Sequence, residues 1–136
     1  MTDSGGEGAR GPGDSRAPVA RVEKPWGYEI HWAKTASYVG KILHITAGHA
    51  LSLQYHNLKE ETVYVQSGRL LYEIEVDGVL TRREMGPGDW IHVPPKTVHR
   101  MTAIEDCDIL EASTNHLDDV VRLEDRYGRE GRNNVP

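Results

Sequence analysis

The sequence predicts an all-β domain of antiparallel strands. From residue 19 onward, short runs of Val, Ile, Leu, Tyr and Trp are separated by Gly, Pro, Asp and Asn at intervals of roughly ten residues, a rhythm typical of short strands and turns. Residues 26–32 alternate between large apolar and small or polar side chains, as in a strand with one buried face. Asp77-Gly78 lies between two such runs and favours a type I′ hairpin, since that turn needs positive φ at both central positions. Many short strands must close or stack to cover their edges, so we expect a sandwich or small barrel.

Nine segments fit this pattern and are expected to form strands. In chain order they are residues 26–32, 38–45, 51–54, 61–66, 69–76, 79–84, 90–93, 99–103 and 108–113. The alternation assigns Trp26, Tyr28 and Trp32 to the core, and Trp90 is assigned to the core as well, in preference to a sugar-stacking role at the mouth of a site.

Two segments differ from the strands. Residues 1–18 contain five Gly, two Pro and five charged residues but no Val, Ile or Leu, so they cannot bury enough apolar area to offset the entropy of ordering. We therefore expect a disordered tail at 1–18 and a single domain at 19–136. Within that domain, Asp118 and Asp119 precede the apolar residues of 117–127, which favours a short C-terminal helix or a wrapped segment.

Charge, hydropathy and cysteine content exclude several classes of function. Sixteen Lys and Arg against 21 Asp and Glu give a formal net charge of −5, so no nucleic-acid partner is expected. The sequence lacks both an apolar run of the roughly 18 residues that a membrane span needs and a signal-peptide pattern, so we expect a cytoplasmic protein without a membrane partner. Cys107 is the only cysteine, which excludes an internal disulfide and a multi-cysteine metal site. A metal would need nitrogen and oxygen ligands.

Four polar residues have a spacing that suits such a metal. Gln54 and His56 are two residues apart and project from the same face of a strand, while Glu61 begins the next strand after a polar turn at 57–60. His99 follows a Pro-Pro segment and begins another strand. Across a barrel these donors can converge on one divalent ion. A mixed nitrogen and oxygen set with one carboxylate leaves the ion positively charged and with open positions, so it would attract an anionic ligand.

The same spacing resembles the two motifs of the cupin superfamily, in which a Gly, a His-x-His pair, a Glu and a Gly are followed by a Gly, a Pro and a His. In this chain the first motif spans residues 48–68 and the second spans 88–99, with Gln54 in place of the first His and Lys96 where the family usually has Gly. The resemblance implies a double-stranded β-helix, or jelly-roll barrel, with one metal site.

A narrower resemblance is to type II mannose-6-phosphate isomerases, and it covers nearly all of residues 24–129. The segments that carry it are residues 25–27, 51–56, 99–100 and 121–129. It implies that Gln54, His56, Glu61 and His99 hold one divalent metal, with zinc expected and manganese, cobalt, nickel and iron as alternatives. It also implies a homodimer. The nucleotidyltransferase domain of bifunctional relatives is absent from this sequence, so no guanylyltransferase activity is expected.

The implied reaction interconverts mannose 6-phosphate and fructose 6-phosphate through a metal-stabilised enediolate, with a sugar or sugar phosphate as the small-molecule partner. The candidate catalytic residues are Lys41, as a proton carrier or phosphate contact, Glu111, as a general base, and Arg122, whose guanidinium suits a phosphate.

Further candidates for substrate binding are Arg100, Arg126 and His92. For each of these residues a plain surface or sheet role is the alternative.

Other functions fit the same pattern. A lyase or epimerase would share the enediolate chemistry, and a dioxygenase would use iron in the same site, although Gln54 argues against that. A non-catalytic sugar-binding cupin would keep the metal and lack a positioned base.

Overall fold

The computed structural model describes residues 20–132, and the tail expected at 1–18 lies outside the described residues. Twelve strands make up the regular structure of this part of the chain. Their bounds are β1 (Ala20–Lys24), β2 (Gly27–Lys34), β3 (Val39–Ile45), β4 (Leu53–Tyr55), β5 (Glu61–Ser67), β6 (Leu70–Val76), β7 (Val79–Met85), β8 (Trp90–Val93), β9 (His99–Ala103), β10 (Cys107–Ser113), β11 (Val121–Glu124) and β12 (Gly131–Arg132). Between residues 20 and 132 there is no helix with the length and apolarity to cross a membrane.

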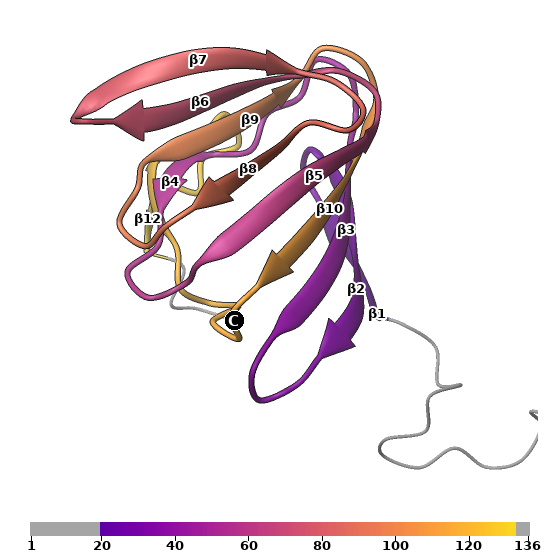
Figure 1. Cartoon of the computed structure of the whole chain (residues 1–136), viewed down its shortest axis with the longest axis vertical. Coiled ribbons are helices and arrows are strands. Elements are labelled where there is room, and N and C mark those ends of the chain that lie inside the picture. Colours follow the sequence, from indigo (N-terminus) through magenta and orange to yellow (C-terminus); the bar gives the residue numbers. More distant parts are fainter. Residues whose placement is uncertain (1–19, 133–136) are drawn as a thin grey trace, which may run out of the picture.

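The strands form two six-stranded antiparallel sheets that face each other (Figure 1). One sheet has the order β1-β2-β3-β10-β5-β8 and the other has the order β12-β11-β4-β9-β6-β7. From β3 to β11 the chain changes sheet at every connection except the β6–β7 hairpin. This is a jelly roll, so the predicted all-β fold is confirmed.

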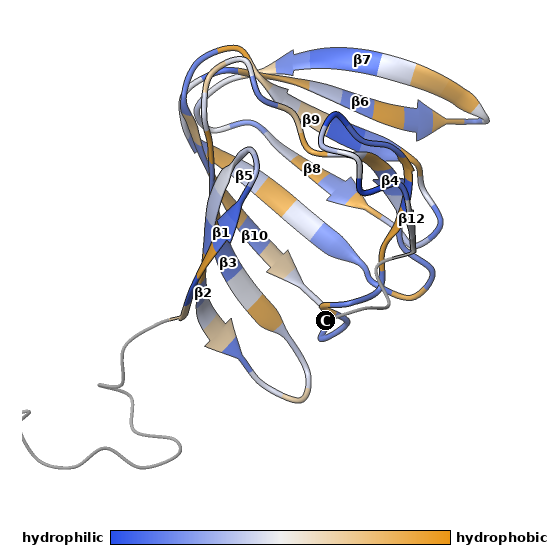
Figure 2. Cartoon of the chain, turned by 180° about the vertical axis from the view of Figure 1, so that it is seen from behind, coloured by the Kyte–Doolittle hydropathy of each residue, from blue (hydrophilic) through white to orange (hydrophobic). Residues whose placement is uncertain are grey.

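The inner face of the first sheet changes from apolar to charged along its strands. On β3, β5 and β10 the buried apolar side chains are Val39, Leu43, Ile45, Val63, Val65, Cys107 and Ile109, and the buried charged ones are Lys41, Glu61 and Glu111. Figure 2 shows the change from hydrophobic to hydrophilic along β5. The apolar end packs against side chains such as Leu70 and Tyr72 of β6 to form the core. The charged end does not pack in this core, and the candidate site lies there.

All nine predicted segments form strands, with ends within about two residues of the expected ones. The predicted hairpin between β6 and β7 is also confirmed, because Asp77 and Gly78 have φ of 51° and 78°. The short strands β1, β11 and β12 were not predicted.

The predicted burial of the aromatic side chains is wrong at two positions. Trp26 is 3% exposed, but Trp32 is 57% and Trp90 is 60% exposed. Trp26 lies before β2 begins, so it does not share the orientation of the residues that follow it. Within β2, Glu29 pairs with the buried Leu43 of β3 and is itself buried. The period of two is therefore correct, but the charged face of β2 points inward.

The C-terminal segment wraps around the barrel and is not helical. β11 pairs with β4, with Val121 opposite Tyr55 and Arg122 opposite Gln54. The helical alternative for residues 117–127 is therefore wrong. Within this segment, β11 pairs with β4 and extends the second sheet instead of forming helical turns.

The motif glycines occupy positions that need positive φ. Gly48, Gly68 and Gly88 have φ of 84°, 87° and 92°. At Gly68 an added Cβ would also lie 2.1 Å from the Asp106 carbonyl oxygen, so this position has no room for a side chain. Lys96, where the motif usually has Gly, adopts φ of 63° and donates its backbone N–H to the His56 carbonyl at 2.6 Å.

Replacing Lys96 with Gly is expected to raise the free energy of unfolding by about 1 kcal/mol, because Gly removes the steric cost of a left-handed backbone. The gain should be visible as a higher midpoint in urea denaturation. Lys96→Ala is the matched control, since alanine keeps the strain and should leave stability nearly unchanged. An unchanged or lower midpoint for Lys96→Gly would show that the turn carries no such strain.

Candidate metal centre and pocket

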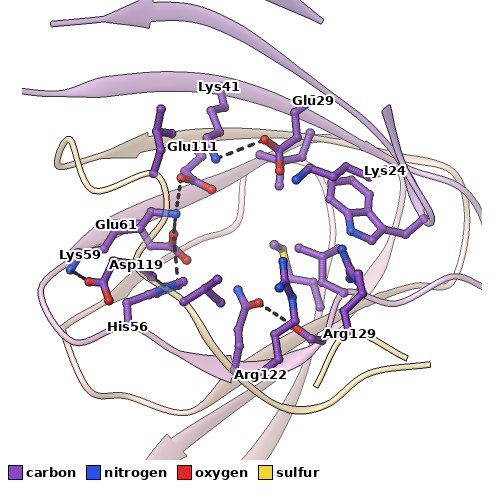
Figure 3. A pocket seen from close by; sticks show the side chains of 18 residues that line it. Lys24, Glu29, Lys41, His56, Lys59, Glu61, Glu111, Asp119, Arg122 and Arg129 are labelled. Carbon is purple, nitrogen blue, oxygen red and sulfur yellow. Dashed lines mark hydrogen bonds and ion pairs between the residues drawn. The ribbon is translucent and has the colours of Figure 1, made fainter. Parts of the chain in front are cut away.

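A pocket opens at the charged end of the barrel. Its cavity volume is about 80 Å³. Five cationic side chains and four carboxylates line it, and Figure 3 shows them around a central space. Buried charges at this density are costly unless they are paired or bind a ligand.

Three potential metal ligands meet beside this pocket, and two of them, His56 and Glu61, line it. His56, Glu61 and His99 each offer one ligand atom, and these atoms lie within 4.8 Å of one another. His56 follows β4, Glu61 begins β5 and His99 begins β9, so both sheets contribute. All three side chains are buried.

Backbone hydrogen bonds orient both imidazoles. The Nδ1 of His56 lies 2.6 Å from the Asp119 carbonyl oxygen, and the Nδ1 of His99 lies 2.8 Å from the Thr97 carbonyl oxygen. Because a carbonyl can only accept, each Nδ1 carries the proton and each Nε2 is left as an acceptor. Both Nε2 atoms are buried and have no hydrogen-bond partner among the described residues. The Nε2 of His99 is 3.3 Å from Glu61 Oε2. Two unpaired nitrogen acceptors beside a carboxylate fit a divalent metal.

Gln54 lines the same pocket next to this cluster. It pairs in register with His99 across β4 and β9 and with Arg122 across β4 and β11. The Ser52 hydroxyl donates a hydrogen bond to Gln54 Oε1 at 2.6 Å, and an amide oxygen has a second lone pair available. Gln54 as the fourth metal ligand remains a prediction, which its place in the pocket lining and its pairing with His99 favour.

Asp119 holds the loop that carries His56. Its carboxylate accepts hydrogen bonds from the backbone N–H groups of Asn57, Leu58 and Lys59 at 3.0, 2.6 and 2.9 Å. Burial opposes ionisation of this carboxyl, but the three backbone hydrogen bonds lower its pKa. From the sequence, Asp119 was predicted only as a helix-start signal, and its role in holding this loop was not predicted.

Lys59 forms a buried bridge between two carboxylates. Its Nζ lies 2.9 Å from Glu61 Oε1 and 3.0 Å from Glu111 Oε2. Burial favours the neutral amine, but attraction to Glu111 and Glu61 raises the pKa of Lys59 above its usual range. Burial alone would raise the pKa of Glu61, yet attraction to Lys59 holds it well below its usual range. From the sequence, Lys59 was predicted only as part of a polar turn, and its bridge between the two carboxylates was not predicted.

A second buried ion pair lies beside the first. Lys41 Nζ is 3.2 Å from Glu29 Oε1, and His31 Nε2 is 2.7 Å from the same oxygen. Burial works against ionisation of Glu29, but attraction to Lys41 and Lys24 lowers its pKa. Lys41 pairs in register with Glu111 across β3 and β10. The two ion pairs are therefore on adjacent strands.

The structure brings some of the predicted substrate and catalytic residues to the pocket. Lys41, Glu111 and Arg122 line it together with Gln54, His56 and Glu61.

The other three candidates for substrate binding do not line the pocket and make contacts elsewhere. Arg100 Nε donates to Glu73 Oε1 at 2.8 Å, Arg126 Nη1 donates to the Gly48 carbonyl at 2.9 Å, and His92 Nε2 lies 2.7 Å from Glu60 Oε2. A substrate role for them stays a prediction that this geometry does not favour.

Comparison with known proteins identifies the fold. Residues 41–112, more than half of the chain, match the family profile described as Cupin domain. No curated protein matches the chain.

Solved structures of low sequence identity share the fold. Oxalate decarboxylase from Bacillus subtilis superposes with a TM-score of 0.69 at 16% identity, over 77% of this chain and 30% of that one; that enzyme has Mn(II) centres. CapF in complex with 3-isopropenyl-tropolone gives 0.67 at 18% identity, over 83% and 37%. KdgF from Halomonas sp. gives 0.59 at 20% identity, over 76% and 92%. This chain thus spans about a third of the first two proteins.

We expect the protein to take up one divalent metal, and His99→Ala and Glu61→Gln to abolish tight binding, because each removes one of three converging donors. The measurement is calorimetric titration of metal-free protein with zinc, manganese and cobalt. His92→Ala, which changes a half-exposed histidine, is the control and should bind normally. Unchanged metal uptake by His99→Ala would show that His99 is not a ligand and that the metal binds at another site.

The metal-free protein is expected to lose stability as the pH falls from 6.5 to 4. Burial and the neighbouring Lys59 lower the pKa of His56 from 6.5 to about 4, so in this window the unfolded chain binds a proton that the folded chain does not. The loss from this one group is on the order of 3 kcal/mol.

Urea denaturation across this pH window, with a chelator present, measures the effect. His56→Gln should flatten the slope, and His92→Gln should not. An equal slope in the His56 variant and the unmodified protein would exclude His56 as the cause.

Proposed function

This chain belongs to the cupin family, and from that premise we propose that it is a metal-dependent sugar-phosphate isomerase that interconverts mannose 6-phosphate and fructose 6-phosphate. The observation that carries the proposal is that one pocket is lined by potential metal ligands, by two buried lysine–carboxylate pairs and by a guanidinium. The reaction itself comes from the sequence resemblance to type II mannose-6-phosphate isomerases. Zinc as the metal and a homodimeric assembly come from the same resemblance and belong to the proposal.

His56, Glu61 and His99, with Gln54 as a fourth donor, would hold the metal. A divalent ion bound there would polarise the sugar carbonyl and so lower the barrier to removal of the neighbouring C–H proton. Glu61 contributes the only negative charge of this donor set. Asp119 contributes indirectly, because its hydrogen bonds position the loop of His56.

Glu111 is the proposed general base. Its carboxylate is buried, and Lys59 fixes one of its oxygens at 3.0 Å. In the direction from aldose to ketose, Glu111 takes the proton from C2 and returns it to C1. A single carboxylate can serve both steps because C1 and C2 are bonded to each other, so a small movement of the base suffices.

Lys41 is the proposed carrier of the second proton, which must pass from O2 to O1. Its ammonium is held at 3.2 Å by Glu29 on the strand next to it. It can donate to O1 as negative charge develops there and accept the proton from O2. The two proton transfers together convert the aldose to the ketose without any external reagent.

NMR of mannose 6-phosphate in heavy water with the zinc-, manganese- or cobalt-loaded protein tests the proposal. We expect fructose 6-phosphate to form with deuterium at C1 or C2, since a base that exchanges with solvent handles the carbon-bound proton. Glu111→Gln should lower the rate about a hundredfold or more, which is the usual contribution of a positioned base.

The matched control is Arg82→Gln, because Arg82 lies on β7 and its side chain is 72% exposed. It should retain full activity, and His99→Ala should have none. Absence of both product and deuterium exchange with every metal, in protein shown to be metal-loaded, would exclude the isomerase. Iron-dependent oxygen uptake would favour a dioxygenase, and saturable sugar binding without exchange would favour a binding protein.

A further inference from the structure

Three cationic side chains gather on the side of the pocket away from the metal ligands. Lys24 ends β1, Arg122 lies on β11 and Arg129 follows β11. Figure 3 shows these three side chains across the central space from His56 and Glu61. Two segments that are remote in sequence, one at Lys24 and one at residues 122–129, therefore place positive charge at one end of a single cavity.

Two of these three charges have no partner within the described chain. Arg129 is bound by Asp125, with Nε at 2.9 Å from Oδ2 and Nη2 at 3.0 Å from Oδ1. For Lys24 and Arg122, the structure gives no hydrogen bond or ion pair from the side chain to residues 20–132. The Nε of Arg122 is buried and unpaired. Glu29, the carboxylate that attracts Lys24, is already bound by Lys41 and His31.

The local electrostatics agree with two unneutralised charges. Burial lowers the pKa of Lys24, and Lys41, Arg129 and Arg122 add to the effect although Glu29 opposes it. Burial also lowers the pKa of Arg122, and Arg129 adds to the effect although Asp125 opposes it. Partly buried cations without a partner are unfavourable in the free protein, so an anion that enters this end of the pocket relieves that cost.

We propose that Lys24, Arg122 and Arg129 form a phosphate subsite, which holds the phosphate of a substrate whose reacting oxygens lie at His56, Glu61 and His99. This inference rests on the proposed function and assigns the residues that select its substrate class. Two uncompensated positive charges match the dianionic phosphate monoester, whereas a carboxylate would neutralise only one of them. The Arg122 guanidinium offers several donors in one plane, which suits phosphate oxygens.

The register of β4 fixes the direction in which the substrate would lie. Gln54 has His99 on one side and Arg122 on the other. A ligand that spans this short strand therefore reaches from the metal ligands to the cationic end. Arg100 and Arg126 have no comparable position, because both are bound to groups outside the pocket.

Binding to the metal-free, full-length protein tests the subsite apart from catalysis and apart from metal coordination. The probes are inorganic phosphate, mannose 6-phosphate, mannose and mannuronate, each titrated against the ¹⁵N-labelled protein and followed by NMR. We expect mannose 6-phosphate and phosphate to bind and to shift the Arg122 Nε–H resonance. Mannose should bind at least tenfold more weakly than mannose 6-phosphate, and mannuronate should fall between them.

Lys24→Met and Arg122→Gln are each expected to weaken phosphate binding about tenfold or more, since each removes a charge-assisted contact. Arg122→Lys should restore part of the loss, and Arg82→Gln should change nothing. The dispersion of the ¹⁵N spectrum shows for each variant that the barrel has folded.

The outcomes separate this inference from the proposed function. Phosphate binding that depends on Lys24 and Arg122 in a protein without isomerase activity would support the subsite and refute the isomerase. Equal affinity for mannose and mannose 6-phosphate would overturn the subsite, and so would mannuronate binding as tightly as the phosphate. A loss of affinity in Arg82→Gln equal to that in Arg122→Gln would also overturn it, because the effect would then be one of overall charge.

Discussion

The candidate site depends on the hydrogen bonds of one loop residue, Asp119. Its carboxylate binds three consecutive backbone amides of the loop between β4 and β5, and its carbonyl accepts from His56 Nδ1. The hydrogen bond from His56 Nδ1 to the Asp119 carbonyl fixes which imidazole nitrogen faces the pocket. The hydrogen bonds from the backbone amides to the Asp119 carboxylate fix where the loop lies. A residue 63 positions away in the chain therefore determines both the tautomer and the place of His56. The same loop carries Lys59, whose bridge to Glu61 and Glu111 requires the loop in this position.

The division of the barrel into an apolar and a charged end explains how so many charges can be buried. Val63 and Val65 pack in the core while Glu61, on the same face of β5, reaches the pocket. The carboxylates of Glu61 and Glu111 share Lys59, and that of Glu29 holds Lys41, so ion pairs offset much of the cost of removing them from water. Stability comes from one end of the barrel and chemistry is concentrated at the other.

Patterns local in sequence were predictable, and contacts set by tertiary structure were not. Strand period and the Asp77-Gly78 turn follow from backbone geometry over short distances, and the meeting of His56, Glu61 and His99 was predicted from the spacing of two motifs. The structure agrees with all of these. Lys59 and Lys24 escaped prediction because the place where a long side chain ends depends on the fold, and an isolated lysine in a sequence resembles any surface lysine. The inward face of β2 was misjudged because Trp26 lies outside the strand, and only the pairing of Glu29 with Leu43 settles the orientation. The C-terminal strand β11 was missed since it is short and its pairing with β4 is irregular.

The pocket is built from two parts of the chain, one inside and one outside the segment that matches the cupin family profile. His56, Glu61 and His99, with Lys41 and Glu111, all fall within residues 41–112, the segment that matches the cupin family. Lys24, Arg122 and Arg129 all fall outside it, on strands and loops added at either end. Substitutions in these flanking segments can therefore alter the cationic end of the pocket without replacing any residue of the candidate metal centre. In the proposed isomerase, ligand choice and metal chemistry would then be encoded in separate parts of the chain.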